Sequence, residues 1–277
     1  MNTTASDQLT RAYSVVSRFS EHRRMLVFDI HSRCTHTITV LKNSQEKHNG
    51  NLHTANRTLI TAWRQYTTEQ IAKNRDQGHL FNPLFFFDIC ETKHSELLGY
   101  LLKPWEKHGQ GNTFLTSFLD MLGVPDPDKG DWHPTIERGR IDILLKRTTP
   151  YPSVIIIENK SNGADDQPNQ LYRYWHKAIH PIVGDTDYND TTIKQNFQVI
   201  YLPSHNEKKP AEHSTQRPDH IPLDKAGGHE ILPLECQIKD FNTNIADWLQ
   251  RVASCIPPTN IRLKAYLEFY TELCKSL

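Results

Sequence analysis

Residues 141–160 read IDILLKRTTPYPSVIIIENK, two β-rich runs separated by a turn-rich segment. In the first run, the alternation of a β-strand places Asp142 on the face opposite to Ile141. In the second run, four consecutive apolar residues precede Glu158, which is typical of a strand buried on both faces. Lys160 follows two residues later and therefore shares a face with Glu158. The sequence predicts two carboxylates and one ammonium on neighbouring buried strands.

Buried carboxylates are costly unless they are paired or bind a metal ion. Hard divalent cations take oxygen ligands, usually one or two carboxylates together with water and substrate phosphate. We therefore expect Asp142 and Glu158 to hold Mg²⁺ or Mn²⁺, which polarises a phosphoryl oxygen and acidifies a water molecule. Lys160 could orient that water or neutralise charge on the phosphate. The pattern predicts phosphodiester hydrolysis, and the alternative is a structural ion pair.

The flanking sequence predicts an α/β arrangement around these runs. Residues 132–160 form a meander of about three strands, because β-rich runs alternate with tight turns. A helix is expected over 168–180, with Asp165 or Asp166 as its N-cap. The apolar run at 196–204 supplies a fourth strand, which can pair parallel to the meander because a helix precedes it.

Apolar residues at helical spacing predict further helices on either side of this core. They cover residues 7–46, 53–74, 85–105, 113–123, 240–254 and 259–276. Polar segments rich in Gly, His or Pro predict loops at 108–112 and 206–230. We divide the chain into a helical N-terminal arm, residues 1–80, and a second domain, residues 81–277.

The composition is that of an ordinary globular chain, with 277 residues, 37% hydrophobic and 23% charged. No apolar stretch approaches the roughly 20 residues that cross a bilayer, and the first residues resemble no export signal, so a cytoplasmic location is expected. Because 32 basic residues balance 32 acidic ones, any site for a polyanion must be a local patch. Five scattered cysteines with no C-x-x-C pair are expected to be reduced and mostly buried.

The order Asp142, then Glu158-Asn159-Lys160, resembles the signature of the PD-(D/E)xK nuclease superfamily. That resemblance implies a restriction-endonuclease-like core of helix, three-strand meander, helix and parallel strand. Gln170 and Tyr174 look like the Gln-x-x-x-Tyr extension of the exonuclease-like branch. Ile141 replaces the Pro of the Pro-Asp pair, a common departure that leaves the metal ligand in place.

Upstream, the segment from Glu91 through LLGYLLKP and HGQGNTFLTSFL is similar to the start of a prokaryotic subgroup of that superfamily. The similarity continues to IADWLQ at 245–250, so it covers roughly residues 81–277. In that subgroup the first helix supplies a glutamate near the metal. The resemblance therefore implies four catalytic residues, of which the three acids bind metal: Glu91, Asp142, Glu158 and Lys160. It also implies that Gln170 and Tyr174 support the site or contact substrate.

The resemblance implies a Mg²⁺-dependent nuclease that cleaves DNA more readily than RNA, in a mobile-element or phage-defence setting. The alternative is an inactive domain of the same fold that binds or senses nucleic acid and acts through a partner. The helices of residues 1–80 would pair with a second copy or with that partner.

Several other residues near the site carry two interpretations. Basic side chains that could contact the substrate's phosphate backbone, or simply be solvated, are Lys93, Arg138, Arg140, Lys146, Arg147, Arg173 and Lys177. Tyr172 and Trp175 could stack on bases, although packing is the commoner role of such residues. His94 and His108 either line the cleft near Glu91 or cap a helix or loop. His176 and His180 have zinc-compatible spacing but no third ligand, which favours surface histidines.

Overall fold

The computed structural model describes residues 32, 35–36, 52–78, 80–138 and 140–277. The helix predicted over 7–46 falls almost entirely outside these residues. The chain forms two compact units, Met1–Asp88 and Ile89–Leu277.

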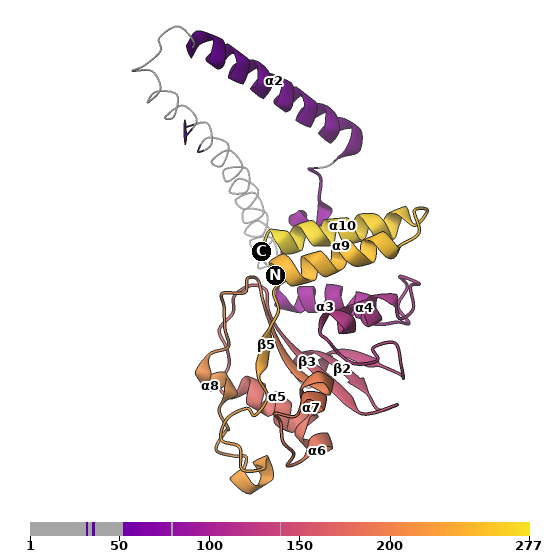
Figure 1. The fold of residues 1–277 in the computed structure, drawn as a ribbon, viewed down its shortest axis with the longest axis vertical. Helices are drawn as coiled ribbons and strands as arrows, with labels where there is room; N and C mark the ends of the chain where they lie inside the picture. The colour runs from indigo at the N-terminus through magenta and orange to yellow at the C-terminus, as the bar shows by residue number, and fades with distance from the viewer. Residues whose placement is uncertain (1–31, 33–34, 37–51, 79, 139) are drawn as a thin grey trace, which may run out of the picture. The chain divides into compact units, whose positions relative to one another are not determined.

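The second unit contains a five-stranded mixed sheet in the order β1-β2-β3-β4-β5 (Figure 1). Its strands are β1 (His133–Arg138), β2 (Ile141–Arg147), β3 (Ser153–Lys160), β4 (Phe197–Pro203) and β5 (Cys236–Ile238). The first three strands are antiparallel neighbours, whereas β4 is parallel to β3 and β5 is parallel to β4. The predicted meander and the parallel fourth strand are confirmed, and β5 is an additional edge strand.

Helices cover both faces of this sheet (Figure 1). On one face α3 packs against β1, β2 and β3, α4 lies beside α3, and α9 and α10 form an outer layer. These helices are α3 (Glu91–Leu102), α4 (Thr113–Met121), α9 (Ala246–Cys255) and α10 (Ile261–Lys275). The π-helix η3 (Phe241–Ile245) leads into α9. The arrangement is the α/β, restriction-endonuclease-like core that the sequence predicts.

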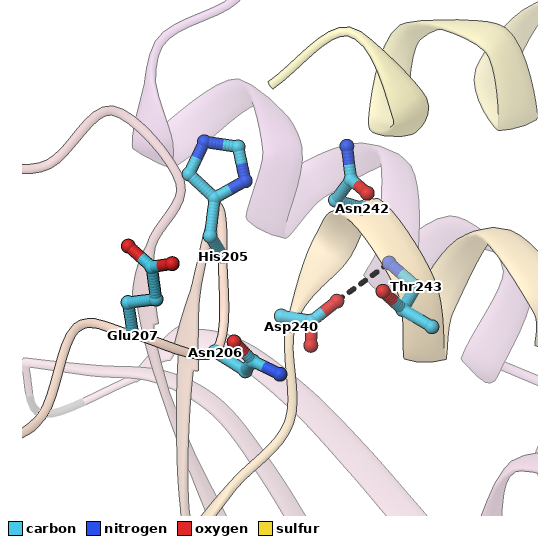
Figure 2. A pocket seen from close by; sticks show the side chains of 6 residues that line it. All are labelled: His205, Asn206, Glu207, Asp240, Asn242 and Thr243. Atoms are coloured by element: carbon cyan, nitrogen blue, oxygen red, sulfur yellow. Dashed lines mark hydrogen bonds between the residues drawn. The ribbon is translucent and has the colours of Figure 1, made fainter.

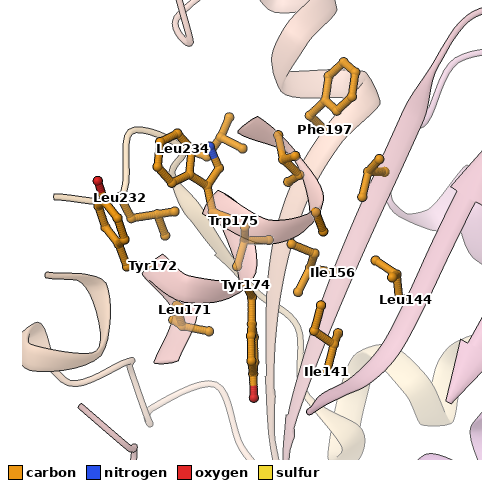
Figure 3. Packing of buried hydrophobic residues seen from close by; sticks show 14 of the residues in the cluster. Ile141, Leu144, Ile156, Leu171, Tyr172, Tyr174, Trp175, Phe197, Leu232 and Leu234 are labelled. Atoms are coloured by element: carbon orange, nitrogen blue, oxygen red, sulfur yellow. The ribbon is translucent and has the colours of Figure 1, made fainter. Parts of the chain in front are cut away.

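The opposite face of the sheet is covered by α5 (Gln170–Ala178), with α6 (His180–Val183) and α7 (Thr191–Asn196) beside it. Apolar side chains of α5 and of the sheet form a buried cluster that includes Leu144, Ile156 and Trp175 (Figure 3). This cluster fixes α5 on the sheet, since burying each large apolar side chain contributes roughly 1.5–3 kcal/mol.

Gly99 allows α3 to approach the sheet closely. A Cβ atom at this position would lie 2.0 Å from Cδ1 of Ile136 on β1. No side chain larger than hydrogen fits without displacing that isoleucine, so Gly99 sets the distance between helix and strand.

Two predicted helices differ clearly from the structure in their bounds, and one predicted helix cap is wrong. The helix expected from residue 85 begins at Glu91, because the preceding residues form the 3₁₀ helix η1 (Pro83–Phe86) and then an extended segment. The helix expected over 168–180 spans only α5, whose N-cap is Asn169 rather than Asp165 or Asp166. Asn169 has a φ of 58° and makes no side-chain capping bond, so the cap prediction was wrong.

The loop predicted over 206–230 contains two short helices, α8 (Glu212–Thr215) and η2 (Leu223–Ala226).

Ile141 packs in the same cluster as Leu144, although alternation predicts opposite faces. It is the first residue of β2 and follows Arg140, whose φ of 71° turns the chain before the pleat is established.

The expectation of mostly buried cysteines was wrong for the described residues. Cys90 and Cys255 are exposed, Cys236 is half-buried and Cys274 is buried, and all four are free thiols. Cysteine packs as a small apolar residue, so its burial depends on tertiary position, which spacing along the chain does not reveal.

The first unit contains α2 (Leu52–Gln77), which confirms the helix predicted over 53–74, and η1. Apolar side chains of α2 remain exposed, namely Leu59, Ile60, Trp63, Tyr66 and Ile71. Within the described part of the chain, no helix combines the length and apolar character that a membrane span requires.

Candidate active site

Asp142 and Glu158 lie opposite each other on adjacent antiparallel strands. The register pairs Ile143 with Ile157, so the next step along both strands pairs Asp142 with Glu158 on the face covered by α5. Glu158 is only 2% exposed, whereas Asp142 is half-buried. The backbone N–H of Asn159 donates a hydrogen bond of 2.7 Å to Oδ2 of Asp142. The structure therefore brings the two predicted carboxylates together.

Burial raises the pKa of both carboxyl groups above their ordinary values. For Glu158, the charge of Asp142 raises the pKa further, because two anions this close disfavour each other's ionisation. For Asp142, the hydrogen bond from Asn159 opposes the effect of burial, while the charge of Glu137 on β1 adds to it. The pair thus has a negative potential that a bound cation would relieve.

Lys160 lies beside the pair, with Nζ 3.0 Å from Oε1 of Glu158. The ammonium also lies 3.8 Å from Oδ1 of Asp166 and donates to the backbone oxygen of Asp165 at 3.4 Å. Burial lowers the pKa of Lys160, but the charges of Glu158 and other nearby acids outweigh it, so the pKa is raised. Lys160 is therefore a buried cation surrounded by acceptors.

Gln170 and Tyr174 form a hydrogen-bonded chain behind Lys160. Oε1 of Gln170 accepts from Nζ of Lys160 at 3.5 Å, and Nε2 of Gln170 donates to the hydroxyl of Tyr174 at 2.9 Å. That hydroxyl donates in turn to the backbone oxygen of Arg140, immediately before β2. The two residues are one turn apart on α5, as their spacing predicts. The structure places them where they position Lys160.

Arg173 makes other hydrogen bonds than those of this chain. Its guanidinium donates to the backbone oxygen of Asn169 at 3.3 Å and to Oε1 of Gln167 at 3.5 Å. It is half-buried on α5, and these hydrogen bonds reach the segment before α5, not the carboxylate pair.

Glu91 is the first residue of α3 and reaches the edge of the site. Its Oε1 accepts from the backbone N–H of Ala164 at 3.3 Å, and its charge acts on Asp142, Glu158 and Lys160. Glu91 therefore contributes to the potential of the site, but its side chain is held by the loop after β3.

Asn159 connects α3 to the carboxylate pair. It lies between Glu158 and Lys160 but points to the other face of the sheet, where its Nδ2 donates to the backbone oxygen of Glu91 at 2.7 Å and to Oγ of Ser95 at 2.9 Å. Asn159, the polar residue between Glu158 and Lys160, thus has a structural role. Strand alternation alone indicates that its side chain faces away from those of its two neighbours.

Asp166 is a site residue that sequence reasoning missed. Its side chain, 4% exposed, accepts from the hydroxyl of Tyr201 at 3.1 Å and from the backbone N–H of Ala211 at 2.7 Å. It brings a second buried carboxylate to Lys160. The pairing with Tyr201, 35 residues away, was not visible from local sequence. The available signal was a pair of consecutive aspartates, Asp165 and Asp166, in the short segment after the strand that carries Lys160.

The residues fit a divalent cation, although a complete ligand set is not preformed. Among the described residues, no group of three or more His, Cys, Asp or Glu side chains is arranged to hold a metal ion. Oε2 of Glu158 is buried and has no hydrogen-bond partner among the residues that the structure describes, which is unusual for a carboxylate oxygen. Two carboxylates with one unused oxygen suit an ion that takes its remaining ligands from water and substrate.

Other predicted site residues are structural. Arg147 is 2% exposed, donates to the backbone oxygens of Pro125, Asp126 and Lys129, and lies against the rings of Trp132 and Tyr151. It is therefore not available for a phosphate backbone.

The aromatic pair on α5 is also part of the core. Tyr172 and Trp175 are both fully buried, so packing, not base stacking, is their role.

The four histidines take roles in packing and loop structure. His94 is fully buried between Phe241 and Tyr270, so it does not line the cleft. His108 is a loop cap that pairs with the backbone oxygen of Lys103 and the N–H of Gln110. The rings of His176 and His180 stack on each other, and both contact the backbone oxygen of Lys225.

A separate polar pocket of about 390 Å³ lies beyond the end of β4 (Figure 2). Its lining includes His205, Glu207 and Asp240. The carboxylate of Asp240 is occupied as the N-cap of η3, where it accepts from the backbone N–H of Thr243 at 2.5 Å and of Asn244 at 3.3 Å. Neither carboxylate of the β2–β3 pair lines this pocket, so the two are distinct places in the fold.

A family model described as the PD-(D/E)XK nuclease superfamily matches residues 81–271. The match covers the whole sheet and the strands that bring Asp142, Glu158 and Lys160 together. The chain belongs to the PD-(D/E)XK nuclease superfamily. No curated protein and no solved structure shows significant similarity to it.

Proposed function

We propose that the chain is a Mg²⁺- or Mn²⁺-dependent nuclease that hydrolyses phosphodiester bonds in DNA in preference to RNA. Membership of the superfamily supports a nuclease-like function in general. The observation that carries the specific proposal is the pairing of Asp142 and Glu158 across two strands, with one buried carboxylate oxygen left unpartnered. A buried acidic pair with raised pKa values is the arrangement expected at a functional site.

In this proposal Asp142 and Glu158 hold the cation, and Glu91 adds negative charge from the start of α3. The cation would polarise a phosphoryl oxygen and acidify a water molecule. Lys160, with its raised pKa, remains an ammonium and neutralises charge that develops on the phosphate. Gln170 and Tyr174 keep Lys160 in place through their hydrogen bonds. Arg173 is the proposed contact for the substrate's backbone.

The proposal is tested by incubating the purified full chain with DNA and, separately, RNA, in Mg²⁺ or Mn²⁺. Asp142→Asn and Lys160→Ala are expected to lose at least about 100-fold in cleavage rate. Asp120→Asn, an exposed acid on α4, is the matched control and should cleave like wild type. Equal cleavage by wild type, Asp142→Asn and Lys160→Ala would remove the assignment.

A second candidate is an inactive domain that binds or senses nucleic acid and acts through a partner. The direct ion pair between Lys160 and Glu158 favours it, since one carboxylate oxygen already has a cation. Titration with Mn²⁺ separates the two candidates. An active site should bind Mn²⁺ and lose that binding in Glu158→Gln, whereas an inactive site should show no difference.

We also propose that residues 1–80 form a separate arm that pairs with a second copy or a partner chain. The exposed apolar side chains of α2 support this, because such residues usually face another surface when they cluster. Light scattering of the full chain should give a mass above the 32.1 kDa of one chain. An Ile60→Lys and Ile71→Lys double variant should return it to one chain. The phage-defence setting stays a prediction.

A further inference from the structure

Lys160 has two buried carboxylates within reach, and they come from different segments of the chain. Its Nζ lies 3.0 Å from Oε1 of Glu158 on β3 and 3.8 Å from Oδ1 of Asp166, in the loop between β3 and α5. The side chains of Lys160, Glu158 and Asp166 are 6%, 2% and 4% exposed. One buried ammonium is therefore shared between two buried acids, and Glu158 is the closer of the two.

The contacts of Lys160 with this loop and with α5 are long. Nζ lies 3.4 Å from the backbone oxygen of Asp165 and 3.5 Å from Oε1 of Gln170. These distances and the 3.8 Å to Asp166 all exceed the roughly 2.7–2.9 Å that is usual when an ammonium donates to a carboxylate. A displacement of about 1 Å towards Asp166 would shorten that contact to the usual distance. The acceptors for a second position of the flexible lysine side chain are therefore already present.

Asp166 is held in place independently of Lys160. The hydroxyl of Tyr201 donates to Oδ1 of Asp166 at 3.1 Å, and the backbone N–H of Ala211 donates to Oδ2 at 2.7 Å. Tyr201 is fully buried on β4, where its register partner on β3 is Glu158. Because these bonds do not depend on the ammonium, Asp166 stays in position when Lys160 moves.

Glu158, the closer partner of Lys160, is also the proposed ligand of the cation. A divalent ion bound at Glu158 repels the ammonium that lies 3.0 Å from the same carboxylate. Moving a buried ammonium away from its partner is strongly unfavourable unless another acid replaces that partner. A site that holds both positive charges therefore needs a second carboxylate within reach of the lysine, and Asp166 meets this need.

We propose that Lys160 changes partner, leaving Glu158 for Asp166 when the active site takes up its cation. Without the cation, the ammonium neutralises Glu158. With the cation, Asp166 keeps the ammonium paired inside the site, and Tyr201 keeps Asp166 in place. Asp166 is thus a positioning residue that acts through Lys160. The ion pair of Lys160 with Glu158 is then the resting state of a metal site and not the mark of an inactive one. The inference rests on the proposed nuclease function and specifies how that site admits its metal.

The test is a double-mutant cycle in which isothermal titration calorimetry measures the affinity of the full chain for Mn²⁺ without nucleic acid. Asp166→Asn should weaken Mn²⁺ binding roughly tenfold, because the ammonium then stays on Glu158 and competes with the ion. In a Lys160→Met background, the same substitution should change the affinity less than about twofold, since no ammonium needs a second partner. A carboxylate that only attracts Mn²⁺ through space would weaken binding equally in both backgrounds, and that result would overturn the inference.

Asp165→Asn is the matched control, because it removes the same charge from an exposed side chain and keeps the backbone oxygen that accepts from Lys160. It should bind Mn²⁺ as wild type does, and melting temperatures show whether each variant is folded. Tyr201→Phe provides a milder variant, since it removes only the hydroxyl that holds Asp166. It should weaken Mn²⁺ binding about threefold, and only when Lys160 is present. Unchanged affinity in both Asp166→Asn and Tyr201→Phe would also overturn the inference.

Cleavage of DNA by the same preparations separates this inference from the proposed function. If wild type cleaves but Asp166→Asn weakens Mn²⁺ binding equally in both backgrounds, the change of partner fails and the nuclease stands. If the cycle shows the expected coupling but no preparation cleaves, the change of partner stands and the nuclease proposal fails. Absence of Mn²⁺ binding by wild type would overturn both.

Discussion

Asp142 is tied to Asn159 by a hydrogen bond of 2.7 Å from the backbone N–H of Asn159 to Oδ2 of Asp142. Since Asn159 lies between Glu158 and Lys160, this bond holds the first carboxylate against the strand that carries the other two charged groups. The side chain of Asn159 extends to the opposite face, where it fixes the first turn of α3. One residue thus links both faces of the sheet at the candidate site.

Replacing Asn159 with Ala should lower the free energy of unfolding by about 2–4 kcal/mol, because its side chain loses three hydrogen bonds and leaves groups of Glu91, Ser95 and Ser161 without their partner. Urea denaturation followed by circular dichroism measures this. Asn162→Ala is the control, since Asn162 is exposed and its two side-chain hydrogen bonds are longer, 3.2 Å from Oγ of Ser161 and 3.3 Å to the backbone oxygen of Ile89. Equal unfolding midpoints for the two variants would contradict the structural role of Asn159.

The stability of the metal-free chain should decrease as the pH rises through the carboxyl pKa values of the site. Burial and mutual repulsion raise the pKa of Asp142 and Glu158, so the folded chain binds protons more tightly than the unfolded chain. The contribution of this pair to the free energy of unfolding is fully present below the ordinary carboxyl pKa. It is lost as the pH rises through the raised pKa values of the folded chain. In EDTA, the melting temperature should fall by several degrees between about pH 5 and about pH 8.

Mn²⁺ should reverse this loss most strongly at the higher pH, where both carboxylates are ionised and able to bind it. The control is an Asp142→Asn and Glu158→Gln double variant, which should show a flatter pH profile and no shift with Mn²⁺. A wild-type melting temperature that rises with pH, or that ignores Mn²⁺, would contradict this linkage.

Replacing Lys160 with Gln should reduce single-turnover cleavage at least about 100-fold, because a buried cation beside the reacting phosphate is lost. Binding of Mn²⁺ should be retained, since the carboxylates remain. Cleavage of a labelled oligonucleotide and a Mn²⁺ titration measure the two effects separately. Lys194→Gln, at an exposed position of α7, is expected to cleave at the wild-type rate. Comparable rates for the two variants would exclude a catalytic role for Lys160.

Asp166 is expected to act as a positioning residue for Lys160. Its charge helps to raise the pKa of Lys160, so Asp166→Asn should move the alkaline limb of the pH–rate profile to lower pH and reduce kcat about tenfold. KM should change little, because the contacts of the Asp166 side chain are to Lys160, Tyr201 and Ala211 of the protein itself. Asp165→Asn, at the exposed neighbouring position, is the control. If Asp166→Asn changed stability but left the pH profile unchanged, Asp166 would be structural only.

The strands that carry the site were predictable because their signals are local. Alternation, apolar runs and tight turns mark β1, β2 and β3, and the register then follows from short connections. By contrast, β5 has only three half-buried residues, and its parallel pairing with β4 depends on a distant segment. A strand this short leaves no periodicity to detect.

The contacts around Lys160 and Arg147 were not predictable from local rules. Asp166 fits the local pattern of a helix cap, but the hydroxyl of Tyr201 and the N–H of Ala211 determine its position. Arg147 follows Lys146 on the same strand, yet alternation and a distant loop bury Arg147 whereas Lys146 stays half-buried. Sequence gives the type of such residues, and tertiary packing decides whether they are structural or face a ligand.

The most direct test is anomalous diffraction at the manganese edge from crystals of the full chain grown with Mn²⁺. We predict a peak between the carboxylates of Asp142 and Glu158, within coordination distance of both. Absence of a peak there, or a peak only in the separate pocket near His205 and Asp240, would contradict the proposal that these two strands form a metal-dependent active site.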